Sequence, residues 1–261
     1  MKKIVAIGGG ENGRLKKDGT RYPYETGPMD KEIIRLTGKE KPNFLLIAHS
    51  QPLEWQQGYF DTMKAIYGDI YGCDCKDLKS DRLADKEYVQ NLVDWADIIY
   101  EGGGDTVTMV DLWRKTGFDS VLRCAWENGK VMCGVSAGAN CWFTAYNTDA
   151  FKIQTGDDNA PMGSRDGLGF VKGYFVPHCD EPERIPSAEI ALKENGLTGF
   201  YISNCTALAI VDDTYKLITS DGAYHSIEAY GKVAYWQDEQ YIEKDIPQQE
   251  NYASFVALVE K

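Results

Sequence analysis

Short apolar runs alternate with longer helix-like segments through the first 145 residues of this 261-residue chain. Near-continuous apolar runs are typical of parallel strands that are covered on both faces. The alternation predicts an α/β fold with a mostly parallel sheet and right-handed crossovers. We expect strands at residues 3–7, 43–48, 97–101 and 130–135, and helices near 29–37, 54–67, 85–95 and 105–127, the last broken at Gly117.

The last third of the chain has a different pattern. It is rich in Gly, Tyr, Phe, Val and Ile, with one helix-like stretch at 186–195. From about residue 205 it reads as short strands, with turns at 212–213, at 221–222 and at Gly231. Because no repeat, low-complexity segment or linker interrupts it, we expect residues 1–261 to form a single domain.

The charge of the chain excludes some classes of partner. Its formal net charge is −12, with no basic stripe for nucleic acid and no polybasic membrane anchor. The N-terminal apolar run is too short for a signal peptide, and no run has the 18 or so apolar residues of a membrane span. The seven cysteines then read as reduced thiols, and we expect a cytoplasmic protein. Nothing in the sequence sets its oligomeric state.

Three glycine-rich loops follow expected strands, at 8–13, 102–105 and 134–138. Ligands bind at the carboxyl ends of strands in open α/β sheets, so these loops mark the expected pocket. The first loop matches G-x-G-x-x-G, but no acidic residue ends the second strand and no helix follows promptly. We therefore expect no nucleotide at this loop.

The third loop, GVSAG, places Ser136 where a buried strand gives way to a helix-like segment that we expect at 137–145. The pattern G-x-S-x-G lifts a nucleophilic hydroxyl clear of a sheet edge on a strained turn. The alternative is a strand–helix junction with small residues for packing. A base, an acid and an oxyanion hole elsewhere in the chain would favour catalysis.

The base must come from three histidines. His178 follows Pro177 at an expected strand end and is the best placed to act as general base. His49 closes the second strand and could border the pocket, whereas a surface role is expected for His225. A metal site at 178–181 is disfavoured because that segment lacks ligand spacing, so no metal is expected.

Position along the chain indicates the orienting acid and the oxyanion-hole donors. An acid should orient the base, and Asp149 is preferred over Asp157, Asp158 and Asp166 because it follows the serine segment closely. The oxyanion hole should combine the N–H groups of Ala137 and Gly104, and Gly103 beside the latter should contact the substrate.

These segments resemble one family of serine peptidases, which includes aspartyl dipeptidase (dipeptidase E) and cyanophycinase. The resemblance rests on EGGGDT at 101–106, GVSAGAN at 134–140, VPHCD at 176–180 and the order Ser, acid, His, and it extends to about residue 220. It implies a three-layer α/β sandwich similar to class I glutamine amidotransferases, with serine in place of their cysteine. It also implies cofactor-free hydrolysis of short peptides after aspartate.

The resemblance also suggests a cation for the substrate's side chain. An arginine shortly after the histidine serves this purpose in the family, which points to Arg184, with Arg165 as a lesser candidate. The other interpretation of Arg184 is an exposed residue paired with Glu181 or Glu183. The leading hypothesis is a serine peptidase for dipeptides with N-terminal aspartate. The alternatives are an esterase or amidase of other specificity, and a non-catalytic binding protein with an amidotransferase-like pocket.

Overall fold

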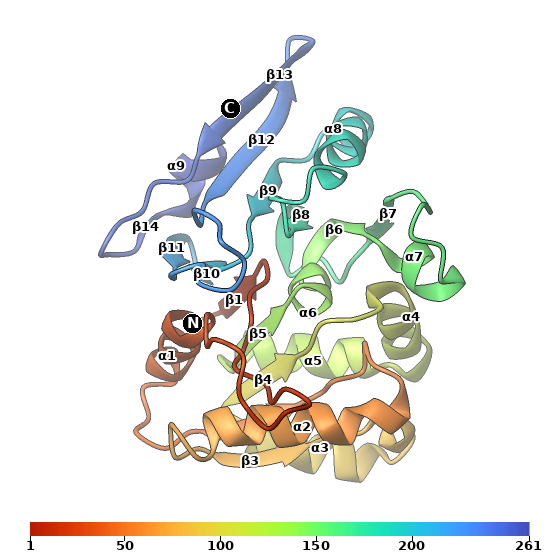
Figure 1. The fold of residues 1–261 in the computed structure, drawn as a ribbon, viewed down its shortest axis with the longest axis vertical. Coiled ribbons are helices and arrows are strands. Elements are labelled where there is room, and N and C mark those ends of the chain that lie inside the picture. Colours follow the sequence, from red (N-terminus) through yellow and green to blue (C-terminus); the bar gives the residue numbers. More distant parts are fainter. Residues whose placement is uncertain (261) are drawn as a thin grey trace.

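The computed structural model describes residues 1–260, and its strands form two sheets (Figure 1). The first sheet has the order β14-β11-β10-β1-β5-β4-β2-β3. Its strands are β1 (Lys3–Ile7), β2 (Asn43–Leu46), β3 (Asp74–Asp77), β4 (Ile98–Glu101), β5 (Val131–Val135), β10 (Thr206–Val211), β11 (Thr214–Thr219) and β14 (Ala253–Ser254). Strands β1 to β5 run parallel to one another. Strand β10 pairs antiparallel with β1, β11 with β10, and β14 with β11.

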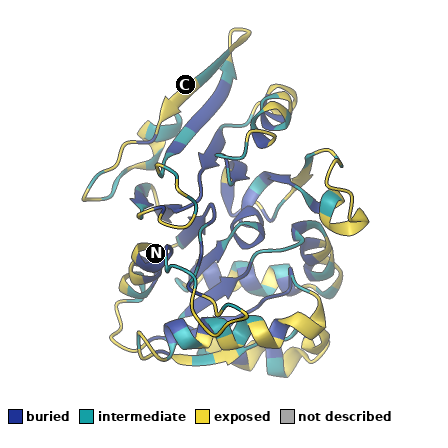
Figure 2. Ribbon diagram, viewed as in Figure 1, coloured by how far each residue is buried: buried dark blue, intermediate teal, exposed yellow. Residues whose placement is uncertain are grey.

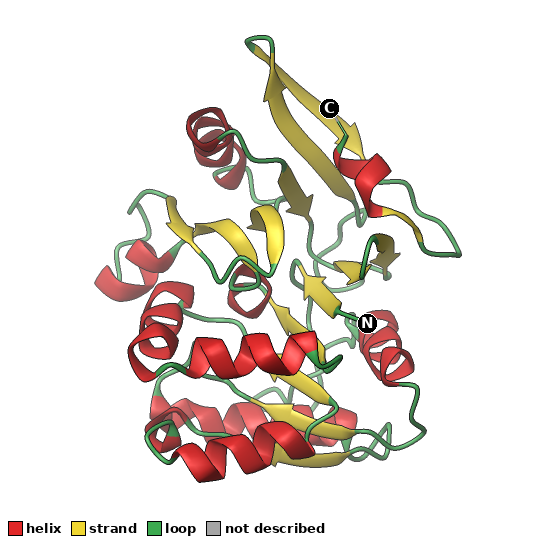
Figure 3. Ribbon diagram, turned by 180° about the vertical axis from the view of Figure 1, so that it is seen from behind, coloured by secondary structure: helices red, strands yellow, loops and turns green. Residues whose placement is uncertain are grey.

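Helices cover both faces of the parallel part of this sheet (Figure 3). Alternate side chains of one strand face opposite cores: Val5 packs with α1 and α2, and Ile4 packs in the core that includes α3, α4 and α5. These helices are α1 (Gly27–Thr37), α2 (Leu53–Tyr67), α3 (Lys86–Trp95), α4 (Thr106–Thr116) and α5 (Phe118–Glu127). A two-sided core explains why β1, β2, β4 and β5 are near-continuous apolar runs, and Figure 2 shows these strands buried in the centre of the molecule. The edge strand β3 is partly exposed.

The second sheet has the order β13-β12-β9-β8-β6-β7. Its strands are β6 (Phe143–Thr148), β7 (Gly163–Asp166), β8 (Val171–Pro177), β9 (Gly199–Ile202), β12 (Gly231–Gln237) and β13 (Gln240–Asp245). Phe143, Phe175 and Phe200 join the larger core of the first sheet, and the other face packs on α8 (Arg184–Asn195). The remaining helices are η1 (Ser80–Arg82), α6 (Ala137–Asn140), α7 (Ala150–Thr155) and α9 (Phe255–Val259).

The expected α/β class and mostly parallel first sheet are confirmed, and the expected strands and helices lie within a few residues of their predicted bounds. Two local predictions were wrong. The helix expected at 137–145 ends at Asn140, because the bulky aromatic side chains that follow pack into the core as strand β6. Gly231 begins β12 rather than making a turn, since it pairs with Ile202 of β9.

Capping residues explain where α4 begins and ends. The carboxylate of Asp105 accepts hydrogen bonds from the N–H groups of Val107 and Thr108, and Gly117 ends the helix in the left-handed conformation. This cap fixes the junction between the glycine loop at 102–104 and the helix. Among residues 1–260, no helix has the length and apolar character needed to cross a membrane.

Candidate active site

The end of β1 holds three distant chain segments in one place. The carbonyl oxygens of residues 7, 8 and 9 accept hydrogen bonds from the N–H groups of Ser136, His178 and Cys205, respectively. The N–O distances are 2.9, 3.2 and 3.0 Å. Successive peptide groups of one strand end thus bring together the predicted nucleophile, the predicted base and the residue that follows Asn204.

Ser136 lies on a strained corner between β5 and α6. Its backbone has φ 54° and ψ −110°, a region that non-glycine residues rarely occupy. The neighbouring glycines permit this corner: a Cβ at Gly138 would lie 2.2 Å from the carbonyl oxygen of Glu101, and one at Gly134 would lie 2.5 Å from that of Gly138. The geometry is that of a nucleophile elbow. The hydroxyl of Ser136 has no hydrogen-bond partner within the described chain.

His178 directly follows β8 and also has a positive φ, 47°. Its Nδ1 lies 2.8 Å from Oδ1 of Asn204, which directly precedes Cys205. Burial lowers the pKa of His178 below its ordinary value of 6.5, and the nearby Arg184 cation lowers this pKa further. The imidazole is therefore held in its neutral form, which a general base requires.

Asp149, the predicted partner of His178, is not hydrogen-bonded to it in the described part of the chain. Its Oδ2 instead accepts from Nη2 of Arg184 at 3.1 Å, and Asn204 occupies the position at Nδ1 of the imidazole. The reason is electrostatic: Arg184 is only 3% exposed, and a buried guanidinium must be paired. Its Nε donates to Glu181 at 2.7 Å, so two carboxylates compensate this one cation.

Arg184 is thus buried and paired rather than an exposed surface residue, and Glu183 is paired with Lys152 instead. The lesser candidate, Arg165, lies on exposed strand β7, where its guanidinium stacks on Phe151.

The buried carboxylate of Glu101 holds the loop at 102–104 in place through backbone hydrogen bonds. This carboxylate accepts backbone hydrogen bonds from Gly102 at 3.0 Å and from His49 and Ser50 at 3.2 Å, and burial raises its pKa to about 8. The N–H of Gly103 donates to the hydroxyl of Tyr59. Glu101 therefore ties the glycine loop to the loop after β2.

The predicted oxyanion-hole amides have no hydrogen-bond acceptor among the described residues. Ala137 is the first residue of α6, where an N–H has no intrahelical partner. Gly104 has φ 147°, and a Cβ there would lie 2.3 Å from the carbonyl oxygen of Ser50. Gly103 lies beside Ser136, since its added Cβ would be 3.7 Å from Cβ of Ser136. All three predicted backbone positions thus border the serine corner or the loop beside it.

The ring nitrogens of His49 are both engaged away from the serine. Nδ1 accepts from the indole N–H of Trp113 at 2.8 Å, and Nε2 lies 2.7 Å from the carbonyl oxygen of Leu78. The ring is therefore the Nε2–H tautomer, and burial lowers its pKa to about 4. His49 packs as a neutral core residue.

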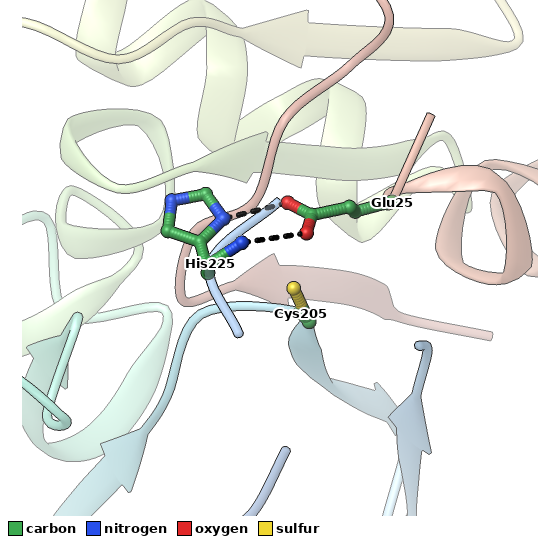
Figure 4. A group of neighbouring side chains, drawn as sticks. All are labelled: Glu25, Cys205 and His225. Atoms are coloured by element: carbon green, nitrogen blue, oxygen red, sulfur yellow. Dashed lines mark hydrogen bonds and ion pairs between the residues drawn. The ribbon is translucent and has the colours of Figure 1, made fainter. Parts of the chain in front are cut away.

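His225 belongs to a cluster with Glu25 and Cys205, whose ligand atoms all lie within 4.8 Å of one another (Figure 4). These residue types can bind a metal ion, but the carboxylate of Glu25 already accepts four hydrogen bonds. It accepts from Nδ1 of His225 at 2.6 Å and from three backbone N–H groups, those of Glu11, Tyr224 and His225. The other ring nitrogen of His225 points away from Cys205 (Figure 4). The cluster fastens the loop at 224–225 to the loop before α1.

Sequence reasoning missed Asn204 and its partner Asp180. The prediction for the residue that orients His178 was limited to carboxylates between Ser136 and His178. It therefore excluded both an amide and any residue after the histidine. The available signal was positional: Asn204 follows β9, and ligand-facing groups gather at the carboxyl ends of parallel strands.

Comparison with known proteins identifies the family. Residues 23–218 match the model of peptidase family S51. The chain belongs to this family. A relative from Bacillus subtilis (strain 168), described as the uncharacterized peptidase YgaJ, is 30% identical over 217 residues, which cover 82% of this chain and 85% of the relative. The S51 assignment makes the chain a serine-type peptidase, so a peptide is its substrate.

Solved structures agree on the fold. A crystal structure of a peptidase from an acI-B1 Actinobacterium has a TM-score of 0.68 at 19% identity and covers 98% of this chain and 97% of its own. A putative peptidase E protein from Listeria monocytogenes EGD-e has a TM-score of 0.60 at 19% identity, with 85% and 100% covered. The expected class I glutamine amidotransferase-like architecture is consistent with both structures.

Proposed function

We propose that this S51 peptidase hydrolyses short peptides through an acyl-enzyme formed on Ser136. The observation that carries the proposal is the convergence of the Ser136 corner and a neutral His178 on the end of β1. In this mechanism His178 takes the hydroxyl proton as Ser136 attacks the scissile carbonyl, and then gives it to the leaving amine. Water then attacks the acyl-enzyme while His178 takes its proton. The proton passes to the oxygen of Ser136 as the acid product leaves.

The developing oxyanion is stabilised by the N–H groups of Ala137 and Gly104. Neither amide has a hydrogen-bond acceptor within residues 1–260, so each is available to a substrate oxygen without breaking an existing hydrogen bond. Gly103 contributes the adjacent surface on which the substrate's backbone lies. Removing one such donor in other serine peptidases costs on the order of 10²–10³ in kcat.

For specificity we propose dipeptides with N-terminal aspartate, with Arg184 as the cation that receives the side-chain carboxylate. A substrate carboxylate loses water on binding and needs a charged partner. Arg184 lies near His178, and its partners Asp149 and Glu181 are 37% and 41% exposed. An incoming carboxylate can therefore replace the one from Asp149 while that group returns to solvent.

A broader specificity for uncharged short peptides is the second candidate. It is favoured by the two carboxylates that already compensate Arg184, because a substrate carboxylate gains only the difference between its own pairing and the pairing it displaces.

Two measurements test the function. A fluorophosphonate should label Ser136, and Ser136→Ala should abolish both labelling and turnover while the protein stays folded. Substantial turnover by Ser136→Ala would refute the mechanism. Hydrolysis of matched Asp-Xaa and Asn-Xaa dipeptides then separates the two specificities. Arg184→Met should reduce kcat/KM sharply for Asp-Xaa and much less for Asn-Xaa, whereas equal losses would leave only the broader candidate.

A further inference from the structure

The amide of Asn204 lies between the imidazole of His178 and the carboxylate of Asp180. Oδ1 of Asp180 accepts from the backbone N–H of Asn204 at 2.7 Å, and its Oδ2 accepts from Nδ2 of Asn204 at 2.9 Å. Oδ1 of Asn204 lies 2.8 Å from Nδ1 of His178. A continuous chain of hydrogen bonds therefore connects a carboxylate to the proposed base through a neutral amide.

The donors and acceptors in this chain can be arranged in only one way. An ionised carboxylate only accepts, so Asp180 must face the NH2 end of the amide. The carbonyl end of Asn204 must then face His178, and because a carbonyl cannot donate, Nδ1 of the imidazole must carry the proton. In a neutral imidazole this leaves the lone pair on Nε2. That is the tautomer that a base needs when its other nitrogen faces the nucleophile.

We propose that Asp180 and Asn204 are positioning residues that set the tautomer of His178, with the negative charge held one residue away from the imidazole. This inference rests on the proposed function of His178 as the base. A carboxylate directly on Nδ1 would raise the pKa of the imidazole, whereas an amide orients the ring with a much smaller effect on its charge.

Close packing supports a fixed geometry for this chain. Asn204 is 3% exposed, and the backbone of Gly9 lies against both partners. A Cβ at Gly9 would lie 2.0 Å from Oδ1 of Asn204 and 2.4 Å from Nδ1 of His178. The ring and the amide therefore cannot move out of these positions independently.

The decisive variant is Asp180→Asn. The oxygen of the new amide at position 180 must accept from the backbone N–H of Asn204. The NH2 group of that new amide then faces the NH2 group of Asn204. Two donors cannot face each other, and rotation of the Asn204 amide relieves this conflict. The rotated amide presents N–H to Nδ1 of His178 and imposes the Nε2–H tautomer. We expect kcat to fall by on the order of 10²–10⁴, with little change in KM.

The double variant Asp180→Asn/Asn204→Asp restores a consistent chain. The new carboxylate at position 204 accepts from both the imidazole and the new amide at position 180. We expect recovery of kcat to within about tenfold of the parent enzyme. The acid limb of kcat/KM should also move to higher pH, because a charge now contacts His178 directly. The other charged groups near the ring, Arg184, Glu181 and Asp149, are unchanged in this comparison.

Nitrogen-15 NMR of histidine-labelled protein measures the tautomer without reference to activity. His178→Gln identifies the signal, and the same changes at exposed positions, Asp158→Asn and Asn159→Asp, serve as matched controls. We expect the Nδ1–H form in the parent and the double variant, and the Nε2–H form in Asp180→Asn. An unchanged tautomer in folded Asp180→Asn, or no rescue by the double variant, would overturn the proposal. Absence of all peptide hydrolysis in the parent would instead refute the proposed function and leave the NMR result standing.

Discussion

Replacement of Gly9 by alanine tests whether the end of β1 determines the geometry of the site. The φ angle of Gly9 is outside the left-handed region, so the backbone itself tolerates alanine. The added Cβ would lie 2.0 Å from Oδ1 of Asn204 and 2.4 Å from the ring of His178, whereas ordinary contacts begin at 3.4 Å. The amide and the ring must therefore move by about 1 Å or more. Such a displacement of a catalytic group costs on the order of 100-fold in rate.

We therefore expect Gly9→Ala to lower kcat by about 100-fold and the free energy of unfolding by about 1–3 kcal/mol, the usual cost of overpacking. Steady-state kinetics on a dipeptide and urea denaturation measure the two effects. The matched control is Gly58→Ala on α2, where no atom lies within 4 Å of the new Cβ. This control should keep full activity and gain about 0.5–1 kcal/mol. A folded Gly9→Ala enzyme with kcat within threefold of the parent would show that the site does not depend on this contact.

Four further outcomes are expected. Because burial and Arg184 lower the pKa of His178, kcat/KM should be retained through pH 6.5 and fall only below it; a midpoint above 6.5 in the parent enzyme would contradict this electrostatic account. Arg184→Met should shift that midpoint upward, since it removes a cation and leaves two carboxylates near the ring, and a pH–rate profile for an uncharged dipeptide measures it. His178→Gln should abolish turnover, whereas His49→Gln should chiefly lower the melting temperature; the reverse result would move the base to His49. Gly104→Ala should reduce kcat by on the order of 10²–10³, because its Cβ meets the carbonyl oxygen of Ser50 and displaces the proposed oxyanion donor.

The parallel sheet was predictable because its determinants are local. Strands β1, β2, β4 and β5 are short apolar runs, and α4 is bounded by the recognisable residues Asp105 and Gly117. The edge strand β3, with sequence DCKD, carries no such signal and was not predicted. Ser136 was predictable for the same reason, since the elbow needs small residues next to the serine in the sequence. The segment after Asn140 was mispredicted because the small residues that precede it, at 137–140, suit a helix. Tertiary packing of Trp142 and Phe143 decides in favour of a strand.

The partner of His178 was not predictable by the same means. Asn204 meets the imidazole only because β8 and β9 are adjacent and parallel, a pairing that no local pattern announces. The charge balance of Arg184 is likewise a tertiary property, since one partner, Glu181, is three residues away and the other, Asp149, lies 35 residues back along the chain. When tertiary contacts are unknown, a carboxylate close to Ser136 in the sequence is the expected partner of the imidazole.

The arrangement of β1 also has a consequence for how the enzyme is made. This strand is synthesised before both of its neighbours, because β5 ends at residue 135 and β10 at residue 211. Both of its edges lack partners until β5 is made, and the edge that pairs with β10 stays open longer, a state in which nascent strands are prone to mispairing. The serine, the histidine and the asparagine cannot meet before β10 is in place. The candidate site therefore cannot be complete until synthesis has passed residue 205.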